Sequence, residues 1–158
     1  MTARTYGNYE PTLAEFKRHI RLTTCDMDMD LEMKLKASIR SAEHYIGRII
    51  ALSTFTYTGS LEPCIRLNGP VVSVESVTVD GQLISDSHYT LKRDALFIDA
   101  VGDEVEVVYT AGFEYPDDDI KAAILLHAAA LFNNPVDSVE TLPKASTRLL
   151  DPYRTWGL

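Results

Sequence analysis

Apolar residues recur every three or four positions in several parts of the chain, which is the spacing of one face of a helix. The clearest case predicts a helix over residues 31–50, with an apolar stripe at Leu31, Leu35, Ile39, Ala42, Ile46 and Ile49. Asp28 or Asp30 is expected to cap the start of this helix. A shorter helix is predicted to begin at Thr12, because Thr12 and Glu15 form the residue pair of a capping box.

Between residue 50 and residue 110 the pattern changes to alternating and β-branched stretches, which predicts strands. The expected strands cover residues 52–59, 64–67, 71–79, 89–91, 95–98 and 104–110. Within the third of them the apolar positions change phase between Val74 and Val77, which predicts a bulge or bend. Asp80-Gly81 predicts a tight hairpin turn directly after it.

A further helix is predicted over residues 117–132, and it is apolar on an unusually large part of its surface. Pro116 and three consecutive aspartates suit its first turn, and Asn133-Asn134-Pro135 ends it. A helix that is apolar on most sides is buried on most sides. In a chain this short, a neighbouring subunit is a plausible second covering surface. We therefore expect a subunit interface that includes Ile124, Leu125 and Phe132.

The segment 142–158 follows that helix and carries large apolar and aromatic side chains that need a partner surface. A short helix is predicted over residues 144–151 and is halted by Pro152. Two interpretations are open, which are packing on the chain's own core and insertion into a partner protein. In the second, the expected contact residues are Arg148, Leu149, Leu150, Tyr153, Arg154 and Trp156.

These elements predict an α+β fold in which a mainly α-helical domain carries a small inserted antiparallel β region. The helical part comprises the long helix after residue 30, the apolar helix near 117–132 and the short C-terminal helix. We expect a single domain over residues 1–158. Within it, the expected parts are an N-terminal arm (1–11), an inserted β region (53–110) and a C-terminal docking segment (142–158).

Composition and charge narrow the function classes. The net charge of −8 argues against a protein that holds nucleic acid on a basic surface. It does not argue against a protein that lets DNA pass without retaining it, because an acidic wall repels phosphate. No apolar run approaches the length of a membrane span. Cys25 and Cys64 form no metal-binding or redox motif, so free thiols are expected.

No motif in the chain indicates a catalytic, metal or cofactor site. Asp26, Asp28 and Asp30 resemble the start of a calcium loop, but the glycine and the terminal glutamate of such a loop are missing. The rival to a structural role is a small cytosolic enzyme or ligand-binding domain. Its site would lie near His127, Tyr109 and Asp119.

Four stretches carry a resemblance to a known family. They are AEHYIGRII (42–50), PVVSVESVTVDG (70–81), the block VEVVYTAGFEYPDDDIKAAILLHAAALFNNP (105–135) and the ending LLDPYR (149–154). On these residues the chain resembles the head–tail connector proteins of long-tailed bacteriophages, also called adaptor or head-completion proteins. The third stretch is the most specific, and the matches cover most of the chain from residue 31 onward.

The resemblance implies a structural protein of the virion without enzymatic activity or cofactors. Such proteins assemble in the host cytoplasm as a homo-oligomeric ring, normally of twelve subunits, below the portal. The ring extends the DNA channel without sequence-specific binding and gives downstream tail or stopper proteins a platform. The resemblance also implies that the C-terminal segment reaches toward the portal protein, which favours docking over core packing.

Overall fold

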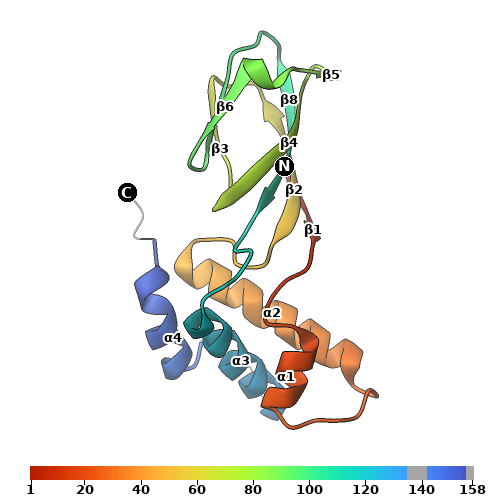
Figure 1. Cartoon of the computed structure of the whole chain (residues 1–158), viewed down its shortest axis with the longest axis vertical. Helices are drawn as coiled ribbons and strands as arrows, with labels where there is room; N and C mark the ends of the chain where they lie inside the picture. Colours follow the sequence, from red (N-terminus) through yellow and green to blue (C-terminus); the bar gives the residue numbers. More distant parts are fainter. Residues whose placement is uncertain (135–141, 156–158) are drawn as a thin grey trace. The chain divides into compact units, whose positions relative to one another are not determined.

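The alternating residues in the middle of the chain form the sheets of one of two units into which the chain divides. The computed structural model describes residues 1–134 and 142–155 (Figure 1). One unit, called the β unit here, comprises Met1–Tyr9 and Ala51–Glu114. The other, called the helical unit, comprises Glu10–Ile50 and Tyr115–Leu158.

The larger sheet of the β unit is antiparallel and has five strands in the order β1-β2-β8-β4-β5. These are β1 (Thr2–Tyr6), β2 (Ser53–Ser60), β8 (Glu104–Ala111), β4 (Val71–Val79) and β5 (Gln82–Leu83). The first residues of the chain, expected to form an extended arm, supply the edge strand β1, which pairs with β2. The bulge predicted in residues 71–79 is confirmed, because the pairing of β4 with β8 shifts register twice between Val71 and Ser76.

A smaller antiparallel sheet has three strands in the order β3-β7-β6. They are β3 (Cys64–Arg66), β7 (Ala95–Ile98) and β6 (Tyr89–Lys92), and a 3-10 turn (Asp86–His88) precedes β6. Each sheet buries alternate residues of its strands and exposes the others. Because the described β unit has no other layer, the two buried faces pack on each other as a sandwich. Hydrogen bonds from Asn68 N to Tyr109 Oη and from Val71 N to Asp94 Oδ1 join the two parts.

The expectation of a mainly helical domain with a small β insertion is wrong. In the described residues, strands begin at Thr2 and continue to Ala111, and they form two sheets of five and three strands. The fold is α+β, with a β unit that has its own core. Tyr109, Val107, Val77 and Leu96 are all fully or almost fully buried in it.

The helical unit is built on a long helix, α2 (Asp28–Ile46), with the shorter α1 (Leu13–His19) packed against it. The capping box of Thr12 and Glu15 at the start of α1 is confirmed. Neither predicted aspartate caps α2. Its N-cap is Met27, which makes no side-chain cap bond, while Asp28 Oδ1 accepts a hydrogen bond from Lys17 Nζ at 2.8 Å.

The long helix ends four residues earlier than predicted. Gly47 takes the left-handed conformation (φ 72°) that a helix C-cap favours. The buried Glu43 carboxylate then accepts a hydrogen bond from Ile50 N at 2.8 Å, which fixes the turn that leaves the helix. Ile50 is buried all the same, so its side chain continues the apolar stripe outside the helix.

The apolar helix α3 (Asp118–Asn133) packs against α1, α2 and α4 (Lys144–Leu150). A second 3-10 turn (Asp151–Tyr153) follows α4. The core of the helical unit contains Phe16, Leu31, Leu35, Ile39, Ile46, Ile120, Ile124 and Leu150, all without exposed surface. None of the helices in the described part of the chain is long and apolar enough to cross a membrane.

Candidate interaction surfaces

The C-terminal segment begins as part of the core of the helical unit. Leu150, at the end of α4, has no exposed surface. Ser146 is also fully buried, and its hydroxyl donates a hydrogen bond to the Ala123 carbonyl oxygen of α3 at 2.9 Å. One side of α4 is therefore fixed against α3 by packing and by a buried hydrogen bond.

After α4 the chain stays on the helical unit through polar contacts. The Tyr153 hydroxyl donates a hydrogen bond to Asp117 Oδ2 at 2.9 Å, and this bond raises the pKa of Tyr153 above its usual 10.0. The backbone N–H and the hydroxyl of Thr155 both donate to the Ile46 carbonyl oxygen at 2.9 Å. These bonds attach the segment to the start of α3 and the end of α2.

A third contact involves a side chain near the end of α2. The Tyr45 hydroxyl donates a hydrogen bond to Asp151 Oδ1 at 2.5 Å. The Arg154 guanidinium lies over the Tyr45 ring, 5.1 Å from the ring centroid. The cation and the aromatic face attract each other. Tyr45 therefore contacts the segment at two residues, Asp151 before Pro152 and Arg154 after it.

The six predicted docking residues are thus divided between core and surface. Leu150 packs in the chain's own core, whereas Arg148 and Arg154 are exposed and Leu149 and Tyr153 are half-buried. Trp156 lies outside the described residues. The exposed residues come from both the last turn of α4 and the chain after it.

The predicted subunit-interface residues of α3 are divided in the same way. Ile124 has no exposed surface and lies in the core of the helical unit. Leu125 and Phe132, about a quarter of a turn away from Ile124 around α3, are half-buried. They leave apolar surface on α3 that packing within the described residues covers only in part.

The three residues of the rival enzyme site do not share a unit. Tyr109 lies in the β unit, where its ring stacks on Phe55 with 5.4 Å between centroids and burial raises the pKa of its hydroxyl. His127 and Asp119 lie on α3, His127 buried and Asp119 exposed at the first turn. Burial lowers the pKa of His127, and its Nδ1 has no hydrogen-bond partner among the described residues. No described hydrogen bond or ion pair links the three.

The described side chains also form no metal-binding cluster. Across residues 1–134 and 142–155, no group of three or more His, Cys, Asp or Glu side chains is placed to hold a metal ion. Cys25 and Cys64 are both free and exposed.

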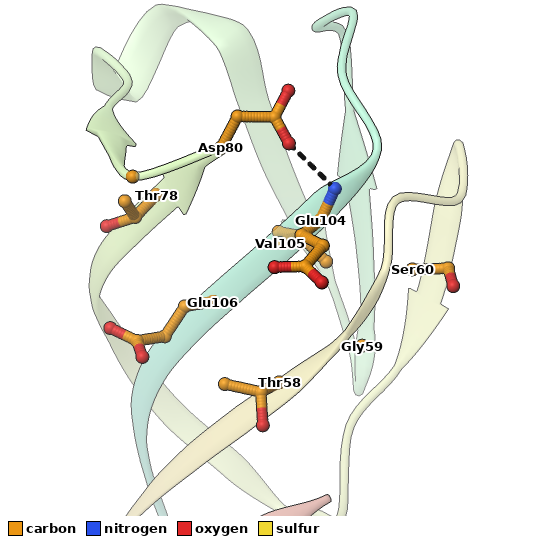
Figure 2. Close-up of a pocket in the computed structure, with 9 residues that line it drawn as sticks. Thr58, Gly59, Ser60, Thr78, Asp80, Glu104, Val105 and Glu106 are labelled. Carbon is orange, nitrogen blue, oxygen red and sulfur yellow. Dashed lines mark hydrogen bonds between the residues drawn. The ribbon is translucent and has the colours of Figure 1, made fainter.

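A groove on the outer face of the five-stranded sheet was not predicted from the sequence. Its volume is about 470 Å³, and Figure 2 shows side chains of three adjacent strands around it. The polar residues that line it are Thr58, Ser60, Thr78, Asp80, Glu104 and Glu106. The alternation of residues 104–110 does place Glu104 and Glu106 on one face. The register that brings them beside Ser60 and Thr58 depends on pairing between distant strands.

The fold and these surfaces describe an α+β protein of two units, each with its own core. No protein-family model and no curated protein matches the chain. Solved structures do match it. A chain in the neck of an empty gene transfer agent (GTA) particle, computed with C6 symmetry, matches with a TM-score of 0.76 and 21% identity, over 99% of this chain and 97% of that one.

Two further structures of GTA particles contain similar chains. In the neck of the native particle, computed with C12 symmetry, the TM-score is 0.76 at 19% identity, over 99% of this chain and 97% of the other. In the virion of the native particle, the TM-score is 0.74 at 21% identity, over 98% and 96%. The expected resemblance to head–tail connector proteins is thereby confirmed as a shared fold with a chain of a particle neck.

Proposed function

We propose that this protein is a structural subunit of a ring at the head–tail junction of a phage or phage-like virion. In this proposal the ring binds below the portal, extends the DNA channel and provides a platform for tail or stopper proteins. The observation that carries it is the fold shared over nearly the full length with a chain from a particle neck. The cyclic symmetry of those necks supports a ring of identical subunits, which we propose to number twelve.

The proposal includes no enzymatic activity. The three side chains named for the rival enzyme site belong to two units. Each of them also has a structural explanation. Tyr109 and His127 are buried in the cores of their units, and Asp119 lies in the first turn of α3. The net charge of −8 suits a channel that must release DNA rather than hold it.

We further propose that the portal contacts the exposed part of the C-terminal segment, through Arg148, Leu149, Tyr153 and Arg154. The two arginines supply charge at the rim of such a contact, and the half-buried Leu149 and Tyr153 supply apolar area. Leu150 supports this surface from within by fixing α4 to the core. Apolar surface of Leu125 and Phe132 on α3 is left for a neighbouring subunit.

The test is binding to purified portal rings, measured by co-sedimentation in a density gradient. Deletion of the segment is a poor variant, because it removes the fully buried Leu150. The double variant Arg148→Glu/Arg154→Glu reverses two exposed charges and also removes the contact of Arg154 with the Tyr45 ring. Arg40→Glu, an exposed position on α2, is the control for charge reversal.

We expect the wild type and the control to migrate with the portal and the double variant to lose most of its binding, by about tenfold. Binding of the double variant equal to that of the control would refute the docking surface. Absence of binding by the wild type at any concentration would refute the ring proposal itself.

A further inference from the structure

The charges of the β unit are unevenly distributed over its two sheets. The unit has ten Asp or Glu residues and only four Lys or Arg residues, a net charge of −6. Of the four cations, Arg4 donates hydrogen bonds to Ser53 Oγ and the Ala51 carbonyl oxygen beside β1. The other three, Arg66, Lys92 and Arg93, all belong to the three-stranded sheet and its hairpin turn.

The outer face of the five-stranded sheet is acidic and rich in hydroxyl groups. Its outward positions on β2 and β8 are Thr54, Thr56, Thr58, Ser60, Glu104, Glu106, Val108 and Thr110. Glu75 of β4 accepts a hydrogen bond from Thr110 Oγ1 on the same face at 2.7 Å. Asp80 borders the groove there and accepts a hydrogen bond from Glu104 N at 2.9 Å (Figure 2). None of the outward positions of these described strands carries a cation.

The outer face of the three-stranded sheet has the opposite character. Its outward positions are Cys64, Arg66, Thr90, Lys92, Ala95 and Phe97. Phe97 is a large apolar side chain with 42% of its surface exposed, and Lys92 Nζ lies 5.6 Å from the centre of its ring. These strand positions carry no carboxylate. Within the described ranges, no ion pair involves Arg66, Lys92, Glu104 or Glu106.

The two outer faces of a sandwich point in opposite directions. A contact between the acidic face of one molecule and the basic face of the next is therefore head-to-tail. Each molecule uses its acidic face for one neighbour and its basic face for the other. A row of such molecules has a free acidic face at one end and a free basic face at the other. A contact of this kind repeats from subunit to subunit, and it closes into a ring when the rotation between subunits fits.

We propose that neighbouring subunits of the ring meet through these faces. Arg66, Lys92 and Phe97 of one subunit pack on the groove beside Asp80, Glu104 and Glu106 of the next. The inference rests on the proposed function and adds to it the surfaces that join the subunits. Charge complementarity favours this occupant, because the groove is lined by three carboxylates and the chain presents cations on the face that points the other way. The exposed aromatic ring adds the apolar anchor that interfaces favour.

Charge-reversal variants test the contact on the full chain with purified portal rings. One variant is Glu104→Lys/Glu106→Lys and the other is Arg66→Glu/Lys92→Glu, all at exposed positions. Each variant alone carries like charges on both faces. The two variants mixed carry complementary charges at every contact if they alternate around a ring with an even number of subunits.

Assembly is followed by mass photometry as the number of subunits bound to each portal. We expect each variant alone to need about a tenfold higher concentration for half assembly, and an equal mixture to return to within about threefold of the wild type. Raising the salt concentration should weaken wild-type assembly and should lessen the defect of each single variant.

A different occupant gives a different result. If the acidic face lines the DNA channel, the acidic-face variant assembles normally and retains DNA. If the face binds a basic segment of the portal or the tail, only the acidic-face variant fails and the mixture does not restore assembly. Either result overturns the proposed contact.

A crosslinking experiment tests the same contact without changing charge. Cys64 already lies on the basic face, and Ser60→Cys places a thiol at the groove. Cys25→Ser removes the other thiol, and Ser87→Cys in place of Ser60→Cys is the exposed control. A short bismaleimide applied to assembled rings should give a ladder of dimers, trimers and larger products with Ser60→Cys only.

Products that stop at dimers, or rings that give no ladder, would overturn the head-to-tail contact while leaving the ring intact. If the wild type forms no ring on the portal, the proposed function fails instead. The two failures are distinguished because assembly is measured before the crosslinker is added.

Discussion

Replacing Leu150 by alanine tests whether the C-terminal segment belongs to the fold. Leu150 has no exposed surface, and a Leu→Ala change at such a position costs about 2–5 kcal/mol through lost burial and the cavity left behind. We take about 3 kcal/mol as the expected loss, because the hydrogen bond from Ser146 still holds the other end of α4. That loss is a large share of the stability of an ordinary domain.

Native-state hydrogen exchange is the suitable assay because it reports each element separately, whereas a chain of two units need not unfold in one step. A loss of about 3 kcal/mol corresponds to more than a hundredfold faster exchange. We expect this acceleration in peptides from α4 and in the part of α3 that packs on it. Leu149→Ala is the matched control, and its half-buried side chain should give about a fivefold change or less.

The reasoning would be refuted if Leu150→Ala accelerated exchange no more than the control does. The segment would then contribute little to the stability of the fold. That result would favour the interpretation in which the whole segment is available to a partner protein. The expected result instead limits docking to the exposed side of α4 and to the residues after it.

Two further predictions concern the two units separately. Gly112 has φ 124°, and a Cβ there would lie 2.8 Å from the Leu52 Cα, whereas Gly81 has φ 79° and open space around it. Gly112→Ala should therefore destabilise the β unit by about 2 kcal/mol more than Gly81→Ala, measured by exchange in β8, and equal losses would contradict the close approach. In the helical unit, burial lowers the pKa of His127 from 6.5, so below about pH 6.5 the unfolded state binds a proton that the folded state does not. The free energy of unfolding should fall as the pH drops through this region until the pKa of His127 in the folded state is reached. In urea titrations at a series of pH values, His127→Leu should lose this part of the pH dependence. The same change of unfolding free energy with pH in the variant and the wild type would contradict the prediction.

Local signals in the sequence predicted most elements because their causes are local. The alternation of residues 104–110 became β8, and the phase change near Val74 became a register shift of β4. The capping pair Thr12 and Glu15 works in the structure as the sequence indicates. In each case the decisive interaction spans a few residues or follows from the side-chain period alone.

Elements fixed by distant contacts were missed. The stretch TARTY becomes the strand β1 because it pairs with β2, with Thr2 opposite Tyr57, and it carries little apolar alternation of its own. The sequence predicts too late an end for α2, because the apolar stripe runs on through Ile49 and Ile50. In the structure Gly47 and the Glu43 carboxylate turn the backbone out of the helix. The sequence also predicts too small a β region. Its strands are short, and its core forms only when residues from two sheets pack together.

The candidate surfaces could be predicted only as sets of residues. The sequence marks Arg148 to Arg154 as unusual, but the division between Leu150 in the core and Arg148 on the surface depends on how α4 packs on α3. The acidic groove likewise depends on strand register, which places β2 hydroxyls beside β8 carboxylates.

Electron cryomicroscopy of purified portal, with and without this protein, tests the central claim most directly. The account predicts an added ring of identical subunits on one face of the portal, coaxial with its channel, with the β units of neighbours in head-to-tail contact. Portal particles that look the same in both samples, with the protein remaining monomeric at high concentration, would contradict it.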